Sequence, residues 1–257
     1  MKYLVDSHSH TIVSGHAYST RMEMIQAAKT KGLEALALTE HAPKMPGTCH
    51  EFYFQNYPVV PRTVDGLHIF MGAELNILDE LGTVDLPDFV LQSLDLAIAS
   101  IHGPCYSTNS EIIEKGSRDL NTQAYLNVMK NPYIHIIGHP DDGRFPVDYE
   151  RLVRGAKETH TLLELNNSSQ RPEGFRVNTE ENAKVMLELC KKEGVYITTG
   201  SDAHIDIDVG GFSCIEKLIQ EADFPEELIA TTSYEKFSRL IRERLTSTGL
   251  YEFSVLK

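Results

Sequence analysis

The sequence contains no tryptophan, and it has only four cysteines among its 257 residues. The cysteines (Cys49, Cys105, Cys190 and Cys214) are scattered without a Cys-x-x-Cys pair, so they predict neither a disulfide framework nor a zinc–thiolate site. No apolar run approaches the roughly 18 residues of a membrane-spanning helix, and the N-terminus has none of signal-peptide length. We therefore expect a cytoplasmic protein with reduced thiols and no membrane partner.

Basic residues are scarce relative to acidic ones: 24 Lys and Arg stand against 37 Asp and Glu, a formal net charge of −13. This acidic charge argues against sequence-independent binding of long nucleic acid, because binding to its phosphates requires clustered basic side chains. What the chain does have is 11 histidines beside those 37 carboxylates. Because neutral imidazoles and carboxylates are the ligands of divalent metals, the composition points to metal binding.

Short apolar runs alternate with amphipathic segments of helical length. The runs cover residues 3–7, 34–39, 67–74, 94–101, 133–138, 161–165 and 195–199. Helices are expected after the N-caps Thr20 and Asn178 and near 119–130, 148–158, 212–221 and 235–247. Such alternation is typical of parallel βα units, and seven of them favour a barrel over a doubly wound sheet. With no repeat or linker, we expect one domain over residues 1–257, in which 42–66 is a long loop.

Side chains that can bind metals follow the carboxyl ends of these strands, where active sites of βα barrels are built. They are His8, His10, His16, His41, Glu74, His102, His139, Asp202 and His204. His8 and His10 are two residues apart, so extended backbone turns both to the same side. With one bridging carboxylate the set offers about ten bonds, too many for a single tetrahedral zinc. The sequence therefore predicts a hydrolytic site with two or three metal ions.

Other polar residues near these positions have ordinary interpretations. His68 and His135 stand at the beginnings of strands, His160 at the end of a helix and His50 in a loop. We expect these four to be structural or solvated side chains. Asp6 is expected to accept a hydrogen bond from a metal-binding histidine rather than to bind metal itself. Such histidines usually donate a hydrogen bond from their second ring nitrogen to a carboxylate or carbonyl.

Four separated motifs, in this order along the chain, resemble the PHP (polymerase and histidinol phosphatase) superfamily. They are Asp6-Ser-His8-Ser-His10 with His16, Thr39-Glu40-His41, Gly138-His139-Pro140 and Gly200-Ser-Asp202-Ala-His204, with Glu74 and His102 between the second and third. The resemblance extends over essentially the whole chain. Shorter stretches, such as His16-Ala-Tyr-Ser19, resemble more narrowly the YcdX group of phosphatases.

The resemblance implies a distorted, TIM-like (β/α)7 barrel with three metal ions at the carboxyl ends of its strands, usually zinc and in some relatives manganese or iron. It implies one ion on His8, His10, Glu74 and Asp202, a second on Glu74, His102 and His139, and a third on His16, His41 and His204. One motif departs from the family, because Thr-Glu-His replaces the commoner Thr-Asp-His. We expect Glu40 to affect only the hydrogen bonds that hold the metal-binding side chains in place, and not to bind metal itself.

Such a site predicts a phosphatase that hydrolyses small soluble phosphate monoesters. Cations neutralise the dianionic phosphoryl group, and a metal-activated hydroxide attacks phosphorus. Glu74 and Asp202 are the predicted catalytic residues. Lys44 and Arg62, in the long loop, are the predicted contacts to substrate phosphate, and further candidates are Arg144, Arg171 and Arg176. The Asn166–Ser169 segment either lines the substrate pocket or caps a turn.

Two other functions remain open at this stage. A metal-dependent nuclease or phosphodiesterase would use the same ligands, but the acidic charge and the lack of a basic, aromatic stripe argue against it. A non-enzymatic interaction module would have lost ligands, whereas every ligand position here is filled. The sequence leaves open the metal, the oligomeric state (a homo-oligomer is compatible with it) and the substrate, which could be histidinol phosphate, a nucleotide or a sugar phosphate.

Overall fold

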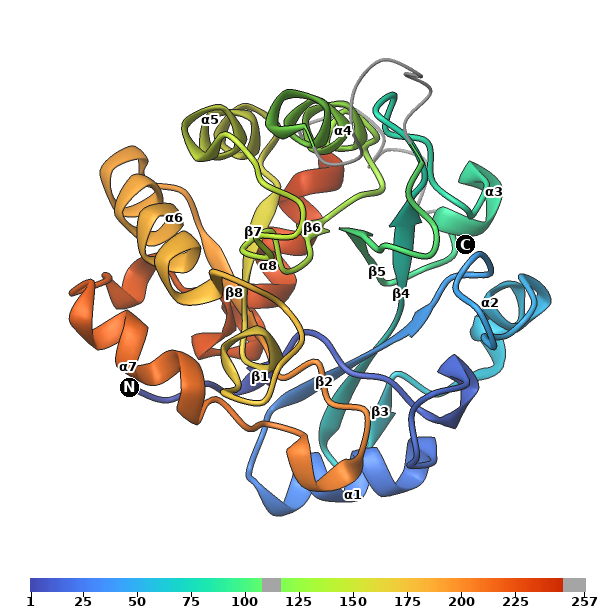
Figure 1. The fold of residues 1–257 in the computed structure, drawn as a ribbon. Helices are drawn as coiled ribbons and strands as arrows, with labels where there is room; N and C mark the ends of the chain where they lie inside the picture. The colour runs from blue at the N-terminus through green and yellow to red at the C-terminus, as the bar shows by residue number, and fades with distance from the viewer. Residues whose placement is uncertain (108–116, 247–257) are drawn as a thin grey trace.

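The computed structural model describes residues 1–107 and 117–246. Seven parallel strands, in the order β1-β2-β4-β5-β6-β7-β8, form a nearly closed barrel with helices around it (Figure 1). The parallel strands are β1 (Val5–Asp6), β2 (Ala35–His41), β4 (Leu67–Ile77), β5 (Leu96–Ile101), β6 (Ile136–Ile137), β7 (Leu162–Asn166) and β8 (Ile197–Gly200). The helices are α1 (Arg21–Thr30), α2 (Phe52–Gln55), α3 (Asp88–Leu91), α4 (Arg118–Val128), α5 (Tyr149–Thr159), α6 (Thr179–Glu193), α7 (Ser213–Glu221) and α8 (Tyr234–Thr246).

The barrel closes between its first and last strands, largely through the segments that follow them. The Ser7 N–H donates to the Thr199 carbonyl over 3.4 Å, the Asp202 N–H to the His8 carbonyl over 2.9 Å, and the His10 N–H to the Ala203 carbonyl over 2.8 Å. The closing hydrogen bonds therefore tie together the two segments that carry His8, His10 and Asp202. In this way the fold itself brings residues from opposite ends of the sequence side by side.

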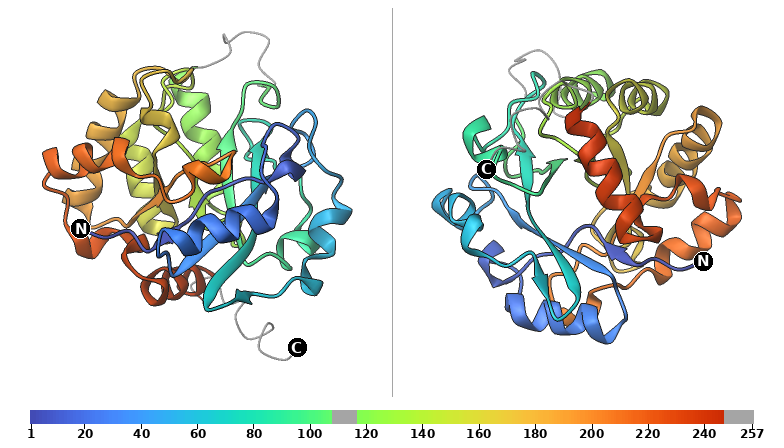
Figure 2. Two further views of the ribbon diagram at one scale, coloured as in Figure 1. Left: turned by 90° about the horizontal axis from the view of Figure 1, so that it is seen from below. Right: turned by 180° about the vertical axis from the view of Figure 1, so that it is seen from behind.

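Along each strand, side chains alternate between the interior of the barrel and its outer surface. The inner set at the amino end of the barrel includes Val5, Ala37, Leu96 and Leu162, and these pack against buried Phe237 of α8. Seen from behind, α8 lies across that end of the barrel (Figure 2). Residues of the opposite parity pack outward against the surrounding helices. The amino end is therefore filled with apolar side chains, and the polar side chains are left to the carboxyl end.

The expected seven strands and their parallel, barrel-like arrangement are confirmed. Two local predictions were wrong. The 42–66 segment is not simply a loop, because it contains α2 and a two-residue strand, β3 (Thr63–Val64), that pairs antiparallel with the beginning of β4. Thr20 forms the predicted capping box with Glu23, and α6 begins after Asn178 as predicted, but the left-handed backbone of Asn178, with φ of 53°, leaves its side chain without the expected capping hydrogen bond. None of the described helices is long and apolar enough to cross a membrane.

Candidate metal centre

All nine predicted ligands come together at the carboxyl end of the barrel. Contacts between their carboxylate oxygens and imidazole nitrogens, or between neighbouring rings, link every member of the set. Most of these side chains are buried, while His102 and His204 are half-buried and His16 is exposed. The prediction from strand ends thus selected residues that do converge, although the chain brings them from seven different segments.

Four of these side chains have the spacing of ligands around one ion. His8 Nε2 lies 3.1 Å from His10 Nε2 and 3.3 Å from Glu74 Oε2, and His10 Nε2 lies 3.4 Å from that same oxygen. Asp202 Oδ1 lies 3.8 Å from His8 Nε2 and 3.3 Å from His10 Nε2. A tetrahedral ion with bonds of about 2.0–2.1 Å separates its ligand atoms by about 3.3–3.4 Å. The donor set and its spacing therefore fit a bound divalent metal.

The carboxylate of Glu74 faces two sets of imidazoles at once. Its Oε2 atom faces His8 and His10 and lies 2.9 Å from His41 Nδ1. Its Oε1 atom lies 3.2 Å from His102 Nε2 and 2.9 Å from His139 Nε2. A carboxylate placed in this way can bridge two cations.

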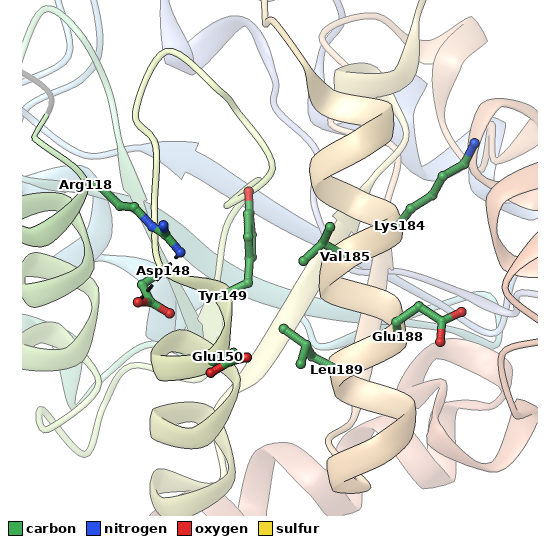
Figure 3. Close-up of a pocket in the computed structure, with 8 residues that line it drawn as sticks. All are labelled: Arg118, Asp148, Tyr149, Glu150, Lys184, Val185, Glu188 and Leu189. Carbon is green, nitrogen blue, oxygen red and sulfur yellow. Dashed lines mark ion pairs between the residues drawn. The ribbon is translucent and has the colours of Figure 1, made fainter.

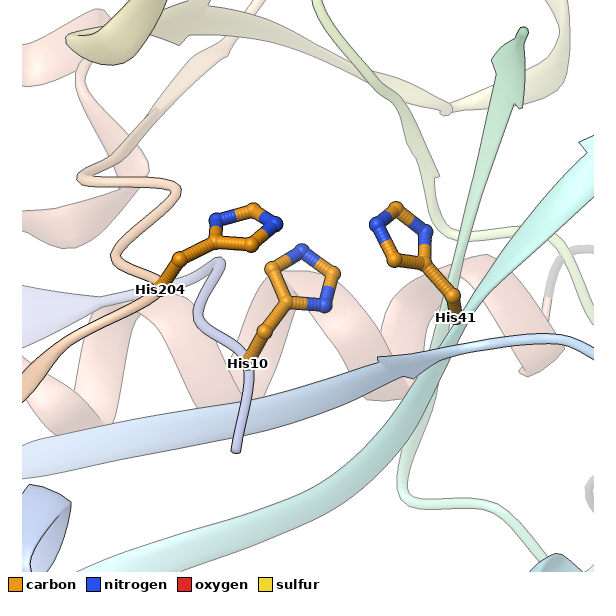
Figure 4. A group of neighbouring side chains, drawn as sticks. All are labelled: His10, His41 and His204. Carbon is orange, nitrogen blue, oxygen red and sulfur yellow. The ribbon is translucent and has the colours of Figure 1, made fainter. Parts of the chain in front are cut away.

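A third group consists of imidazoles alone. His10, His41 and His204 present nitrogens that lie within 4.8 Å of one another (Figure 4). The ring of His16 stacks against those of His41 and His204, with centroids 4.8 and 4.9 Å away. Buried Nδ1 atoms of His41 and His139 have no hydrogen-bond partner in the described protein. Buried polar atoms are normally satisfied, and a divalent cation would satisfy His41 Nδ1, which lies 2.9 Å from Glu74 Oε2, whereas His139 faces Glu74 with Nε2.

Four imidazoles are oriented by hydrogen bonds from Nδ1, so that Nε2 is directed to the cluster. The acceptors are Glu164 Oε1 for His8 (2.8 Å), Ser14 Oγ for His10 (3.2 Å), Asn76 Oδ1 for His102 (2.8 Å) and the Asp202 carbonyl for His204 (3.0 Å). Ser14 Oγ itself donates to Glu40 Oε2 over 2.7 Å. Glu40 therefore acts on His10 through Ser14 and does not join the cluster.

The charges of the cluster are strongly coupled. Burial disfavours ionised Glu74, but the neighbouring imidazoles of His102, His8 and His41 outweigh it and hold the Glu74 pKa well below its ordinary value. Burial likewise opposes protonated His8, yet Glu164, Glu74 and Asp202 raise its pKa well above the ordinary value. For His10, burial and the nearby His41 and His204 lower the pKa. Even without metal, the site therefore favours an ionised Glu74 carboxylate beside a protonated His8 imidazole.

Asp6 does not have the role expected for it. Its carboxylate accepts hydrogen bonds from the backbone N–H groups of His8 (3.4 Å), Ser201 (2.9 Å) and Gly210 (2.8 Å), so it fixes loops rather than an imidazole. The carboxylate that accepts from an imidazole Nδ1 is Glu164, which the sequence analysis missed. The available signal was a single acidic residue inside the apolar run of β7.

A cavity of about 490 Å³ opens onto the cluster. Its lining includes His16, His41, Glu74, His102, His139, Asp202 and His204 together with the cationic Arg144, Arg171 and Arg176. The buried guanidinium of Arg176 donates to Asp202 Oδ2 over 3.1 Å, to Asn166 Oδ1 over 3.2 Å and to Ser169 Oγ over 3.0 Å. Asn166 Oδ1 also accepts from the Ser169 N–H. The Asn166–Ser169 segment thus both caps a turn and supports the cavity wall.

The two cations predicted to contact substrate phosphate are not brought to this cavity. Arg62 pairs with Asp95 at 2.5 Å and lies near Tyr234 at the amino end of the barrel, because β3 has already returned the chain to the beginning of β4. Lys44 is exposed and is not among the residues that line the cavity, and its backbone N–H is held by Asp85. The structure therefore does not bring Lys44 and Arg62 to the cavity, whose cationic lining consists of Arg144, Arg171 and Arg176.

The histidines expected to be structural lie outside the cluster. His68 stacks on Tyr234 with centroids 3.6 Å apart, and His50 Nδ1 accepts from the Phe52 N–H. His160 ends α5 in a left-handed conformation, and buried His135 accepts from the Ala97 N–H over 3.1 Å. None of the four belongs to a group of potential metal ligands among residues 1–107 and 117–246.

A hollow of about 650 Å³ lies on the outer surface between α5 and α6 (Figure 3). Its two basic side chains form ion pairs, since Arg118 pairs with Asp148 at 3.6 Å and Lys184 with Glu180 at 2.6 Å. None of the described residues that line it is a histidine or cysteine. Within the described residues, the imidazoles that could bind metal therefore line the barrel cavity and not this hollow.

Comparison with known proteins agrees with this geometry. The PHP domain family model matches residues 6–198. A "probable phosphatase" of Clostridium novyi is 41% identical over 244 residues, which cover 95% of this chain and 96% of the relative. A "probable phosphatase" of Acetivibrio thermocellus is 43% identical over 244 residues, covering 95% and 97%.

The fold is also shared with a solved enzyme. Histidinol phosphate phosphatase from Lactococcus lactis, crystallised with zinc, L-histidinol and phosphate, superposes with a TM-score of 0.61 at 22% identity and covers 90% of this chain and 97% of its own. The family model over residues 6–198 and the similarity to the two relatives along almost the whole chain lead to one assignment. The chain belongs to the PHP domain family, and its relatives support a phosphatase.

Proposed function

We propose that this protein is a metal-dependent phosphatase that hydrolyses phosphate monoesters of small molecules at a centre of two or three divalent ions. The observation that carries the proposal is the position of Glu74, whose two oxygens face separate sets of imidazoles at 2.9–3.4 Å beside a cavity of about 490 Å³. Such an arrangement suits a dianionic group that needs several cations around it.

Three sets of residues would hold the ions. His8, His10, Glu74 and Asp202 form the first, Glu74 with His102 and His139 the second, and His16, His41 and His204 the third. When bound, the ions neutralise charge on the phosphoryl group and lower the pKa of a coordinated water. Zinc is the ion we favour, because imidazole-rich sets suit it and the solved Lactococcus enzyme was crystallised with it.

The chain's own contribution is to bind and orient the phosphoryl group. Arg176 is held in place by Asp202, Asn166 and Ser169, and its buried Nε–H has no hydrogen-bond partner. Nε lies 3.9 Å from Asp142 Oδ2, beyond hydrogen-bonding distance, so its N–H could donate to a phosphate oxygen. Arg144 and Arg171 add positive charge to the cavity lining. Both oxygens of Asp202 are engaged, one by the imidazoles and one by Arg176, so we assign Asp202 a holding role.

The size of the cavity favours a small substrate over a long polymer. A volume of about 490 Å³ is in the range of pockets that enclose most of a small ligand. The formal net charge of −13 would repel a polyanion away from the site. The substrate's leaving group would be an alcohol whose identity the cavity walls select.

The test is elemental analysis of protein purified without chelator, combined with p-nitrophenyl phosphate hydrolysis on the same sample. We expect two or three ions per chain and turnover that a chelator abolishes. His8→Ala should lose metal and activity together, whereas His160→Ala, altered outside the cluster, should keep both. Bound metal with cleavage of oligonucleotides and no monoester hydrolysis would replace the proposal with a nuclease. Protein without metal after reconstitution would refute it.

A further inference from the structure

Glu164 lies inside the barrel, directly beneath the cluster. It belongs to β7, where Leu162 faces the interior and Leu163 and Leu165 pack outward, so the parity of the strand places Glu164 inside. Its side chain is fully buried. An ionised carboxylate in such a position is costly unless hydrogen bonds and nearby cations compensate it.

Both oxygens of Glu164 are used, and they are used by two different ligand segments. Oε1 accepts from Nδ1 of His8 over 2.8 Å, and Oε2 accepts from the backbone N–H of His139 over 2.8 Å. His139 has a left-handed backbone, with φ of 29°, a conformation that a residue other than glycine seldom adopts without support. One side chain therefore orients an imidazole after β1 and fixes a strained turn after β6.

Two nearby glycines leave room around this carboxylate, Gly200 for Glu164 itself and Gly138 for the adjacent Ser100 hydroxyl. A Cβ on Gly200 would lie 2.2 Å from Glu164 Oε1 and 2.6 Å from the Cβ of His8. A Cβ on Gly138 would lie 3.5 Å from Glu164 Oε2 and 2.2 Å from Ser100 Oγ. The space around Glu164 is thus fitted to a carboxylate in one position.

We propose that Glu164 is a positioning residue of the metal centre, which directs His8 Nε2 into the cluster and holds the His139 turn so that both ligands meet Glu74. The inference rests on the proposed metal centre. Glu164 binds neither metal nor substrate itself, because its oxygens are occupied by His8 Nδ1 and the His139 N–H. Its effect is exerted through the geometry and basicity of the ligands.

Glu164→Gln is the sharpest variant, because it keeps the size of the side chain but leaves one acceptor oxygen in place of two. Either His8 Nδ1 or the His139 N–H then faces an amide NH₂ group. Glu164→Asp keeps the charge, but its side chain is one methylene shorter. The hydrogen bonds from His8 Nδ1 and the His139 N–H should therefore lengthen. Asp95→Asn is the matched control, since Asp95 is a carboxylate in an ion pair at the other end of the barrel.

The measurement is Zn²⁺ affinity of the metal-free proteins, by competition with a chromophoric chelator, together with thermal unfolding with and without Zn²⁺. We expect Glu164→Gln to weaken Zn²⁺ binding about 10–100-fold, Glu164→Asp to weaken it less, and Asp95→Asn to leave it unchanged. The rise in unfolding temperature on adding Zn²⁺ should shrink in the Glu164 variants alone.

Two results would overturn the inference. One is wild-type Zn²⁺ affinity in Glu164→Gln or, if that variant does not fold, in Glu164→Asp. The other is an equal loss of unfolding temperature with and without Zn²⁺, which would indicate a role in folding only. Failure of the wild-type protein to bind Zn²⁺ is a separate outcome, and it would refute the proposed metal centre as well.

Discussion

Nε2 of His8 lies 3.1 Å from Nε2 of His10, while the Nδ1 atom of each ring has a partner of its own. Two imidazole lone pairs that face each other at this distance repel, so a proton or a metal ion has to lie between them. The raised pKa of His8, which its carboxylate neighbours produce against the effect of burial, provides that proton in the metal-free protein. The pair is therefore a place where a metal ion can replace a proton.

His10→Ala should reduce the effect of metal on stability, because it removes a ligand of the first site. A ligand that binds only the folded state stabilises it by about 2.7 kcal/mol at 100 times its dissociation constant. We expect Zn²⁺ to raise the unfolding temperature of the wild-type protein more than that of His10→Ala, as measured by scanning calorimetry. His68→Ala, in which the altered ring stacks on Tyr234, should retain the effect of Zn²⁺. An undiminished rise in His10→Ala would contradict the assigned first site.

The seven strands could be predicted because each is a short apolar run and because parallel strands end at a common edge. This one geometric rule was enough to assemble His41, Glu74 and His102 at the same end of the barrel. The rule needs only strand positions, which hydrophobic patterning supplies. It needs no knowledge of loop paths.

The role of Glu164 and the position of Arg62 required information that the sequence does not carry in its patterns. Glu164 reaches His8 across 156 positions of sequence, and that contact depends on the register between β7, β8 and the segment after β1. Arg62 was assigned to the site because it follows β2, but β3 turns the loop back to the beginning of β4. A two-residue strand is too short to leave a periodic signal.

Gly200→Ala should destabilise the protein and test how tightly the interior is packed. The new Cβ would lie 2.2 Å from Glu164 Oε1 and 2.6 Å from the Cβ of His8, and both atoms belong to fully buried side chains. Overpacking of this kind costs about 1–3 kcal/mol. Urea unfolding should therefore show a lower free energy of unfolding. Gly103→Ala, whose nearest contact would be Phe145 Cζ at 3.9 Å, should be neutral, and equal stability of the two variants would argue against the tight fit.

Arg176→Lys should weaken turnover of phosphate monoesters. A lysine ammonium cannot reproduce the fork that holds Asp202, Asn166 and Ser169 while Nε–H remains available. Loss of hydrogen bonds to charged groups costs about 1.5–3 kcal/mol each, so we expect kcat/KM for p-nitrophenyl phosphate to fall about 10–100-fold. Arg62→Lys is the matched substitution at the amino end of the barrel and should leave kcat/KM unchanged. A larger loss in Arg62→Lys would restore the role first predicted for that residue.

His135 should make the stability of the protein depend on pH. It is 3% exposed, and its Nδ1 accepts from the Ala97 N–H over 3.1 Å. Burial, together with the positive charge of Arg244, lowers its pKa from 6.5 to about 3. Between these values the unfolded chain binds a proton that the folded protein does not bind. The free energy of unfolding therefore falls as the pH decreases below 6.5, and the contribution of this group to the fall ends near pH 3.

His135→Asn removes the titrating ring and keeps an acceptor that can face the Ala97 N–H. Between pH 7.0 and 5.5, the free energy of unfolding of the wild-type protein should fall by about 1 kcal/mol more than that of the variant. Urea unfolding at the two pH values, with both proteins in the same metal state, measures the difference. His50→Asn provides the control, because water reaches the exposed ring of His50 in the folded protein as well. If the wild type and His135→Asn lose the same free energy, His135 is protonated within the fold, and burial and Arg244 do not lower its pKa as assigned.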